Sequence, residues 1–385
     1  MNSTNPTNPS NPSNFTNYLT IDVEDFFQVH AFSKLINPTD WDKYESRVEK
    51  NTYHILDLLG EAQSIQHLPA LGRFKIQNST SAIQNSKFKI RNYYRATFFI
   101  LGWIAERYPH LVKEIHSRGH EIASHGYGHK VIYQQSREEF REDVRRSKKI
   151  LEDLTGQEVI GYRAPTYSIT NKTLWALQIL WEEGYRYDSS IFPIRHDYYG
   201  IPHCPRFPFI WNLDAPTPKI LDLRPSCPAA KLPSGPAFSP PSPKQTATDR
   251  GAQTTDNDQR STPSASQLPS RLAVQQPRYI IEFPLSTLNL FGQRLPIAGG
   301  GYFRLFPYRF IRWALRRVNN VEKQPFVFYL HPWEIDPDQP RLNHAGIFSK
   351  FRHYSNLHKT RYRFARLLQD FSFTSILNGN PYLQN

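Results

Sequence analysis

Five ionisable residues each follow a short apolar run of the chain. These residues are Asp22, His125, Arg163, Asp188 and His331. Runs such as 326–330 are typical of buried strands, and helical patterns alternate with them, as at 307–318. Alternating strands and helices predict a parallel sheet. Because the carboxyl ends of parallel strands meet at one edge, we expect the five side chains at one site, as in barrel enzymes.

Two long stretches interrupt this alternation. Residues 62–94 show no strand or helix period, and residues 212–277 hold 12 of the 31 prolines. We interpret both as disordered insertions, with a disordered leader at 1–14 and a separate tail at 377–385. The remainder of 15–376, about 260 residues, suits a single distorted (β/α) barrel.

The charge distribution bears on the partners of the chain. The net charge is +13, but the excess is concentrated in the two insertions and at 341–385. We therefore predict no nucleic-acid partner, and we retain a peripheral membrane contact through the basic C-terminal region as a hypothesis. No apolar run is long enough for a transmembrane helix, and no signal-peptide pattern precedes Phe15, so we expect a cytoplasmic protein.

A histidine pair is the strongest single motif. His125 and His129 are four residues apart, and Gly126 and Gly128 indicate a tight turn after a strand. Both rings could reach one metal ion at this spacing. Alone, the motif is more typical of two surface histidines, so its weight comes from the other motifs.

Five segments together resemble the polysaccharide deacetylase superfamily (NodB-homology, carbohydrate esterase family 4). The segments are 20–25, 124–129, 163–165, 188–190 and 330–331. Segments 299–304 and 331–334 are similar to deacetylases associated with exopolysaccharide and exosortase gene clusters in bacteria. The resemblance implies a barrel of the NodB-homology type that hydrolyses N-acetyl groups of N-acetylhexosamine residues in a polysaccharide or its precursor.

The resemblance also implies a mechanism that depends on a divalent metal, with zinc expected first. His125, His129 and one carboxylate would hold the metal. Asp22 would be the general base, Arg163 its ion-pair partner, and His331 the general acid, oriented by Asp188. The oxyanion and substrate contacts would come from Pro165, Thr166 and Tyr167, with the backbone N–H of Thr166 as donor.

The metal carboxylate is Glu24 or Asp25. The family commonly has two adjacent aspartates here, whereas Val23 follows Asp22 in this chain. Side chains alternate along a strand, so Asp22 and Glu24 should point to the same side and Val23 to the other. We therefore expect Glu24 to be the ligand, with Asp25 as the alternative if the chain bulges.

Two other functions remain open at this point. One is hydrolysis of a small cyclic amide, as in allantoinase-like relatives of the superfamily. The other is a degenerate barrel that binds polysaccharide without hydrolysing it. The presence of all the residues that the mechanism requires argues against degeneracy.

Overall fold

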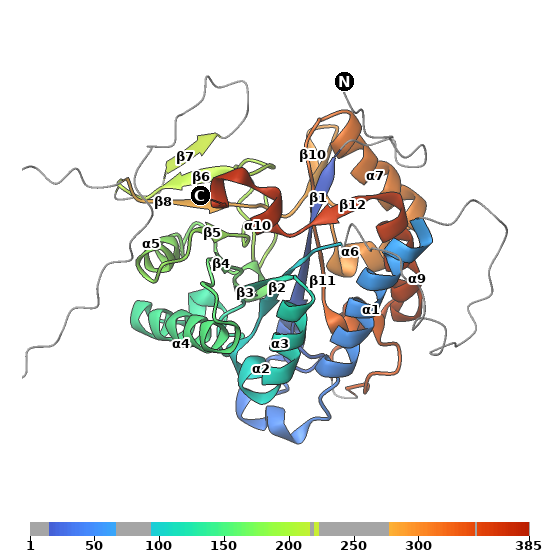
Figure 1. Cartoon of the computed structure of the whole chain (residues 1–385), viewed down its shortest axis with the longest axis horizontal. Helices are drawn as coiled ribbons and strands as arrows, with labels where there is room; N and C mark the ends of the chain where they lie inside the picture. Colours follow the sequence, from blue (N-terminus) through green and yellow to red (C-terminus); the bar gives the residue numbers. More distant parts are fainter. Residues whose placement is uncertain (1–14, 67–93, 216–218, 223–276, 343–344, 385) are drawn as a thin grey trace, which may run out of the picture.

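Within the residues that the computed structural model describes (15–66, 94–215, 219–222, 277–342 and 345–384), a ten-stranded sheet organises the chain (Figure 1). Across the sheet the strands are β11 (Val327–Leu330), β1 (Thr16–Val23), β2 (Thr97–Ile100), β3 (Glu121–Ser124), β4 (Gly161–Tyr162), β5 (Tyr187–Asp188), β8 (Tyr279–Glu282), β6 (Phe209–Asn212) and β7 (Lys219–Asp222). β12 (Ser372–Thr374) also pairs with β1. The pairs from β11 to β8 are parallel, which confirms the predicted α/β class.

Helices follow most of the parallel strands. They are α1 (Val48–Gln66), α2 (Gly102–Arg107), α3 (Pro109–Ser117), α4 (Arg137–Thr155), α5 (Trp175–Glu182), α6 (Gly300–Leu305), α7 (Tyr308–Asn320), α8 (Ile347–Tyr354), α9 (Leu357–Asp370) and α10 (Ile376–Gly379). Figure 1 shows α1, α7 and α9 on one side of β1, and α4 and α5 together on the other. The Ser136–Glu139 capping box predicted for α4 is present, and Gly156 ends that helix in the left-handed conformation.

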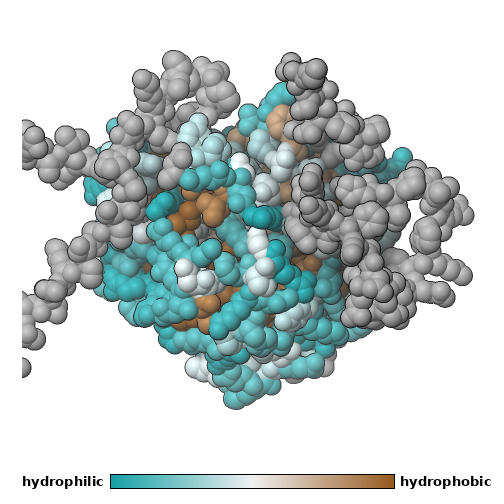
Figure 2. Space-filling view, viewed as in Figure 1, coloured by the Kyte–Doolittle hydropathy of each residue, from teal (hydrophilic) through white to brown (hydrophobic). Residues whose placement is uncertain are grey.

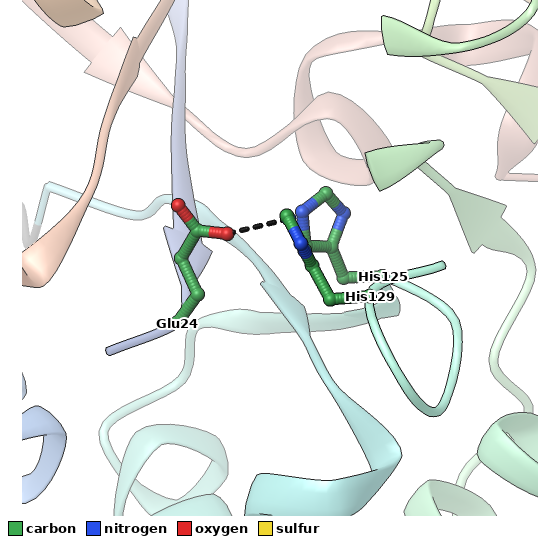
Figure 3. Close-up of side chains that lie close together, drawn as sticks. All are labelled: Glu24, His125 and His129. Atoms are coloured by element: carbon green, nitrogen blue, oxygen red, sulfur yellow. Dashed lines mark ion pairs between the residues drawn. The ribbon is translucent and has the colours of Figure 1, made fainter. Parts of the chain in front are cut away.

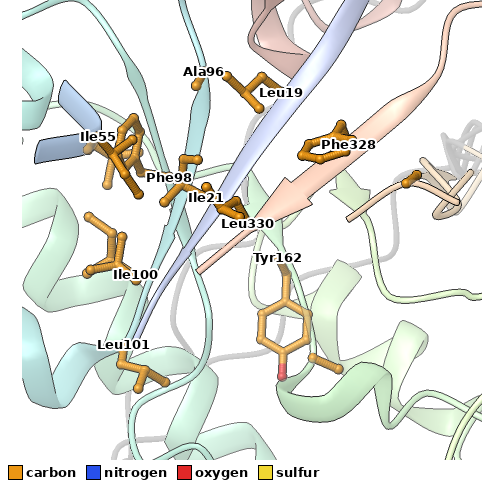
Figure 4. Close-up of a cluster of buried hydrophobic side chains, with 14 of the residues drawn as sticks. Leu19, Ile21, Ile55, Ala96, Phe98, Ile100, Leu101, Tyr162, Phe328 and Leu330 are labelled. Carbon is orange, nitrogen blue, oxygen red and sulfur yellow. The ribbon is translucent and has the colours of Figure 1, made fainter. Parts of the chain in front are cut away.

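Side chains alternate along β1 and belong to two separate hydrophobic clusters. Leu19 and Ile21 belong to a cluster that joins the strands to the helices, together with residues such as Phe98 and Phe328 (Figure 4). Each such large side chain stabilises the fold by about 1.5–3 kcal/mol when it is removed from water. The intervening positions of β1 point to the opposite face of the sheet.

That opposite face forms the inside of a distorted barrel. Tyr18, Phe99, Tyr187 and Tyr329 come from four different strands and meet in one buried cluster. Among the described residues no ladder of backbone hydrogen bonds joins β8 to β11, so the sheet does not close as a regular barrel. A side-chain contact bridges the gap instead, since the Val327 N–H donates to Ser286 Oγ at 2.8 Å.

The boundaries predicted for the insertions and tail need correction. α1 continues to Gln66 and β7 pairs antiparallel with β6, so both insertions begin later than the sequence suggested. The apolar part of β7 is too short to stand out among prolines. The tail is also packed, because the 3-10 helix η6 (Pro381–Leu383) buries Leu383. Residues 67–93 and 223–276 and the predicted leader 1–14 lie outside the described residues.

Few apolar residues lie on the face of the molecule that Figure 2 shows. Figure 2 shows mainly hydrophilic residues over the described part of that face, with small brown clusters between them. Among the described helices, none is both long and apolar enough to cross a membrane.

Asp25 has a structural partner, the start of α1. Its Oδ2 accepts hydrogen bonds from the N–H groups of Arg47 (2.7 Å) and Val48 (3.0 Å) and from Ser46 Oγ (2.8 Å). Its Oδ1 accepts from the Phe26 N–H at 2.8 Å. A helix leaves its first N–H groups without backbone partners, so this buried carboxylate stabilises α1 from a distant part of the sequence.

We predict that Asp25→Ala lowers the free energy of unfolding by about 2–4 kcal/mol, because buried N–H groups lose their acceptor. The measurement is urea denaturation followed by circular dichroism. Asp153→Ala is the matched control: its carboxylate pairs with Lys149 on the exposed surface of α4, and its loss should cost less than about 0.5 kcal/mol. Equal losses in the two variants would contradict the capping role.

Candidate functional site

A cavity opens at the carboxyl ends of β1, β3, β4 and β11. The predicted residues that line it are Asp22, Glu24, His125, His129, Thr166, Tyr167 and His331. The parallel register of the sheet thus brings together residues that are as much as 309 positions apart in the chain, since Glu24 and Trp333 are in direct contact. Arg163 lies beneath the cavity floor and is fully buried.

Glu24, His125 and His129 converge on one point (Figure 3). One ligand atom from each lies within 4.8 Å of the other two. Oε2 of Glu24 is buried and, among the described residues, accepts no hydrogen bond of regular geometry, although Nε2 of His129 lies 2.6 Å away. A buried carboxylate oxygen that faces two imidazole rings forms a set of ligands that suits a divalent metal.

Backbone geometry holds the two histidines in place. Nδ1 of His125 donates to the backbone carbonyl of Arg163 at 2.8 Å, which leaves Nε2 for a ligand. The loop to His129 is held by Asp143 of α4, whose carboxylate accepts from the N–H groups of Tyr127 (2.9 Å) and Gly128 (3.2 Å). A Cβ at Gly126 would lie 2.6 Å from that carboxylate, so the turn requires glycine. No pattern in the sequence indicated this role for Asp143.

Asp22 is fixed by a buried ion pair. Nη1 of Arg163 donates to its Oδ1 at 2.6 Å, and Tyr167 donates its hydroxyl to Oδ2 at 3.3 Å. Arg163 also donates to Thr20 Oγ1 (2.7 Å) and to the backbone carbonyl and hydroxyl of Ser189. Because the guanidinium is wholly buried, these acceptors must compensate for the water that its charge has lost.

His331 is oriented by Glu334. Its Nδ1 lies 2.6 Å from Glu334 Oε1, and the other oxygen of Glu334 accepts from Arg304 Nε at 2.7 Å. Burial alone would lower the pKa of His331, but the carboxylates of Glu24, Glu334 and Asp22 raise it to about 9. Nε2 of the ring lies 3.5 Å from Glu24 Oε1 and 3.8 Å from Asp22 Oδ2.

Asp188 does not orient His331 in this structure, contrary to the sequence-based expectation. Its carboxylate accepts from Ser190 Oγ (2.5 Å), and Ser190 Oγ in turn accepts from the Ala164 N–H at 2.7 Å. Asp188 is also aligned with Glu282 on the neighbouring strand β8. It therefore supports the segment after β4 from behind and is not part of the cavity lining given by the described residues.

The segment after β4 is strained beside the cavity. Thr166 has φ 56° and ψ 24°, and Tyr167 has φ 54°. A β-branched residue rarely adopts this conformation, and such strain is commonly associated with functional sites. Pro165 is buried and does not line the cavity among the described residues.

Sequence reasoning missed the residues behind His331 and Glu24. Glu334 and Arg304 hold His331, and Trp333 donates Nε1–H to Glu24 Oε1 at 3.1 Å. Trp333 also stacks on His331, with ring centroids 5.2 Å apart. The available signal was the spacing of Glu334 three residues after His331, on a turn that the 3-10 helix η5 (Pro332–Ile335) now explains.

Two family models match separate parts of the chain. Residues 90–187 match the family model described as polysaccharide deacetylase. In these residues the chain is similar to polysaccharide deacetylases. Residues 252–378 match a second model, a domain of unknown function, DUF3473.

Two curated relatives match shorter segments. A peptidoglycan-N-acetylglucosamine deacetylase of Bacillus cereus is 35% identical over 85 residues, which cover 22% of this chain and 31% of the relative. A peptidoglycan deacetylase of Helicobacter pylori is 31% identical over 96 residues, which cover 25% of this chain and 32% of the relative. The chain thus spans about a third of the length of these relatives.

Among solved structures, a Mycobacterium smegmatis chain assigned to the polysaccharide deacetylases is similar along nearly the whole length. The match covers 99% of this chain and 94% of that chain, with a TM-score of 0.47 and 15% sequence identity.

The buried pair of Asp188 and Glu282 predicts a pH dependence of stability. Burial raises the pKa of Asp188 to about 6, and burial together with the charge of Asp188 raises the pKa of Glu282 well above its usual range. The folded state therefore binds more protons than the unfolded state, and stability should fall as the pH rises from about 4 through 6 and beyond.

In Glu282→Gln this fall should be shallower, because a neutral amide replaces the carboxyl that loses its proton. The measurement is the free energy of unfolding between pH 4 and 9, taken from denaturant titrations. Glu158→Gln, which alters a surface ion pair with Arg186, should keep the wild-type slope. Identical slopes in wild type and Glu282→Gln would contradict the raised pKa values of this pair.

Proposed function

We propose that this chain catalyses metal-dependent hydrolytic N-deacetylation of N-acetylhexosamine residues in a polysaccharide or its precursor. The observation that carries the proposal is the meeting of Glu24, His125 and His129 beside Asp22 and His331 in one cavity. A metal site flanked by a carboxylate and an imidazole provides the groups that amide hydrolysis needs.

A divalent metal would be held by Glu24, His125 and His129, with zinc as the first candidate. The donor set of two imidazoles and one carboxylate is typical of catalytic zinc sites that keep a position open. When bound, such a metal supplies Lewis-acid polarisation of the substrate carbonyl and makes a coordinated water more acidic. Asp25 is engaged at the start of α1, which favours Glu24 as the carboxylate ligand.

Asp22 would act as the general base. Its Oδ2 faces His331 and the hydroxyl of Tyr167, while Oδ1 is occupied by Arg163. The guanidinium thus fixes the carboxylate and leaves one oxygen to accept a proton from the attacking water. General base catalysis of this kind contributes about 10²–10⁴-fold to the rate.

His331 would donate a proton from Nε2 to the departing amine. Glu334 holds Nδ1, so the ring cannot turn its other nitrogen toward the substrate. Glu334 acts through His331 and is a positioning residue. Its charge is balanced by Arg304, which places a buried chain of alternating charges behind the imidazole.

The backbone N–H of Thr166 would stabilise the oxyanion. The left-handed conformation of Thr166 and Tyr167 presents this segment to the cavity. One donor of this kind is worth about 3–4 kcal/mol of transition-state stabilisation. The need to direct this N–H into the cavity would then explain why the segment keeps its strained conformation.

The substrate class rests on the relatives. The two relatives are deacetylases of peptidoglycan by name, and the Bacillus cereus protein is named for N-acetylglucosamine. For this chain we propose the wider class of N-acetylated glycans, since the matched segments cover only part of each relative.

We expect the purified chain to release acetate from N-acetylated glycans, to lose this activity on chelation, and to regain it with zinc or cobalt. Asp22→Asn and His331→Ala should each reduce turnover by about 10²–10⁴-fold while metal content is retained. Glu334→Gln should lower kcat with little change in KM, because Glu334 acts on His331 and does not contact the substrate. The measurement is an acetate assay with metal analysis on the same samples.

The matched control is His358→Ala, an exposed histidine on α9 that should leave activity unchanged. Full activity of the metal-free protein would overturn the mechanism. Activity on a small cyclic amide, without acetate release from any glycan, would replace the proposed substrate class by the allantoinase-like one.

A further inference from the structure

One helix carries an unusual apolar surface. Ile347, Phe348 and Phe351 of α8 are exposed by 83%, 83% and 59%. Residues at these spacings share one side of a helix. A helix of a globular protein normally turns such a side toward the core, so this side needs another apolar environment.

The opposite side of α8 is firmly attached to the protein. His353 is buried against Phe32 and Trp333, with ring centroids 4.7 Å and 4.2 Å away. Arg304 donates to the backbone carbonyls of Arg352 (2.9 Å) and His353 (2.7 Å). Arg304, which also pairs with Glu334, therefore holds α8 with its apolar side facing outward. The apolar side is exposed in the folded protein.

The surroundings of α8 are basic. Between residues 339 and 369 the sequence contains no Asp or Glu. A second cavity adjoins the helix and is lined by Arg341, Leu342, Lys350, Phe351, Tyr354 and Ser355. Its charged members are both cations, and the hydroxyl of Tyr354 holds its wall by accepting from the Leu342 N–H at 2.9 Å. A basic surface of this kind attracts anionic groups.

We propose that α8 docks this protein on an anionic phospholipid surface. Ile347, Phe348 and Phe351 would enter the boundary between headgroups and acyl chains, and Arg341 beside them would lie near the lipid phosphates. Apolar side chains beside cations are typical of helices that lie in the membrane interface.

An anionic membrane fits these features better than a second copy of the chain. A symmetric contact through α8 would bring two basic surfaces together without any acidic residue from 339 to 369 to compensate them. The catalytic cavity lies beside the proposed membrane contact, because Arg352 and His353 of α8 also line it. The proposal goes beyond the deacetylase function and does not depend on it.

The test is flotation of the full-length chain with vesicles. Vesicles of phosphatidylcholine mixed with phosphatidylglycerol should bind the protein, and vesicles of phosphatidylcholine alone should bind it far less. The double variant Phe348→Ser/Phe351→Ser should reduce the partition coefficient at least about tenfold. Arg341→Gln should reduce it about fivefold, since a basic residue near an anionic surface contributes by its charge.

Phe291→Ser is the matched control, because Phe291 is 95% exposed in the turn between β9 (Thr287–Leu290) and β10 (Gln293–Pro296). It should bind vesicles as the wild type does, and thermal melting should show that every variant is folded. Three results would overturn the proposal: absence of binding to anionic vesicles, equal loss in Phe291→Ser, or a dimer that Phe348→Ser/Phe351→Ser disperses in a protein that ignores vesicles.

Discussion

The buried ion pair between Arg163 and Asp22 is the interaction on which the site depends. The guanidinium sits under the cavity with no exposed surface and contacts β1 through Thr20 and Asp22 and the end of β5 through Ser189. Breaking such a pair leaves a buried charge without compensation, at a cost of about 3–5 kcal/mol. The pair therefore connects the stability of the barrel to the position of its reactive carboxylate.

The alternation of β1 explains why much of this arrangement could be predicted from the sequence. Ile21 and Val23 are apolar and pack toward the helices, so Asp22 and Glu24 must face the interior. The parallel class, the strand ends and the shared location of Asp22, His125 and His331 follow from patterns of only a few residues. These patterns remain valid in the folded protein because the register of a strand determines which side chains face the core.

The supporting contacts could not be predicted in the same way. Asp25 caps a helix that begins 23 residues later, and Asp143 holds the histidine loop from the middle of α4. Glu334 replaces Asp188 as the partner of His331, because Asp188 is turned toward Ser190 and Glu282. The contacts of Asp25 and Asp143 depend on how distant elements pack, which no spacing within one segment specifies. The contact of Glu334 with His331 is local, and the spacing of three residues was its only sign in the sequence.

The central claim is that Glu24, rather than Asp25, completes the metal site. Titration of the metal-free protein with zinc tests it most directly, with wild type, Glu24→Gln and Asp25→Asn compared under one condition. We predict that Glu24→Gln weakens binding by more than about a hundredfold, whereas Asp25→Asn leaves the affinity nearly unchanged and lowers only the stability. The opposite ranking, with zinc affinity lost in Asp25→Asn and kept in Glu24→Gln, would contradict the account.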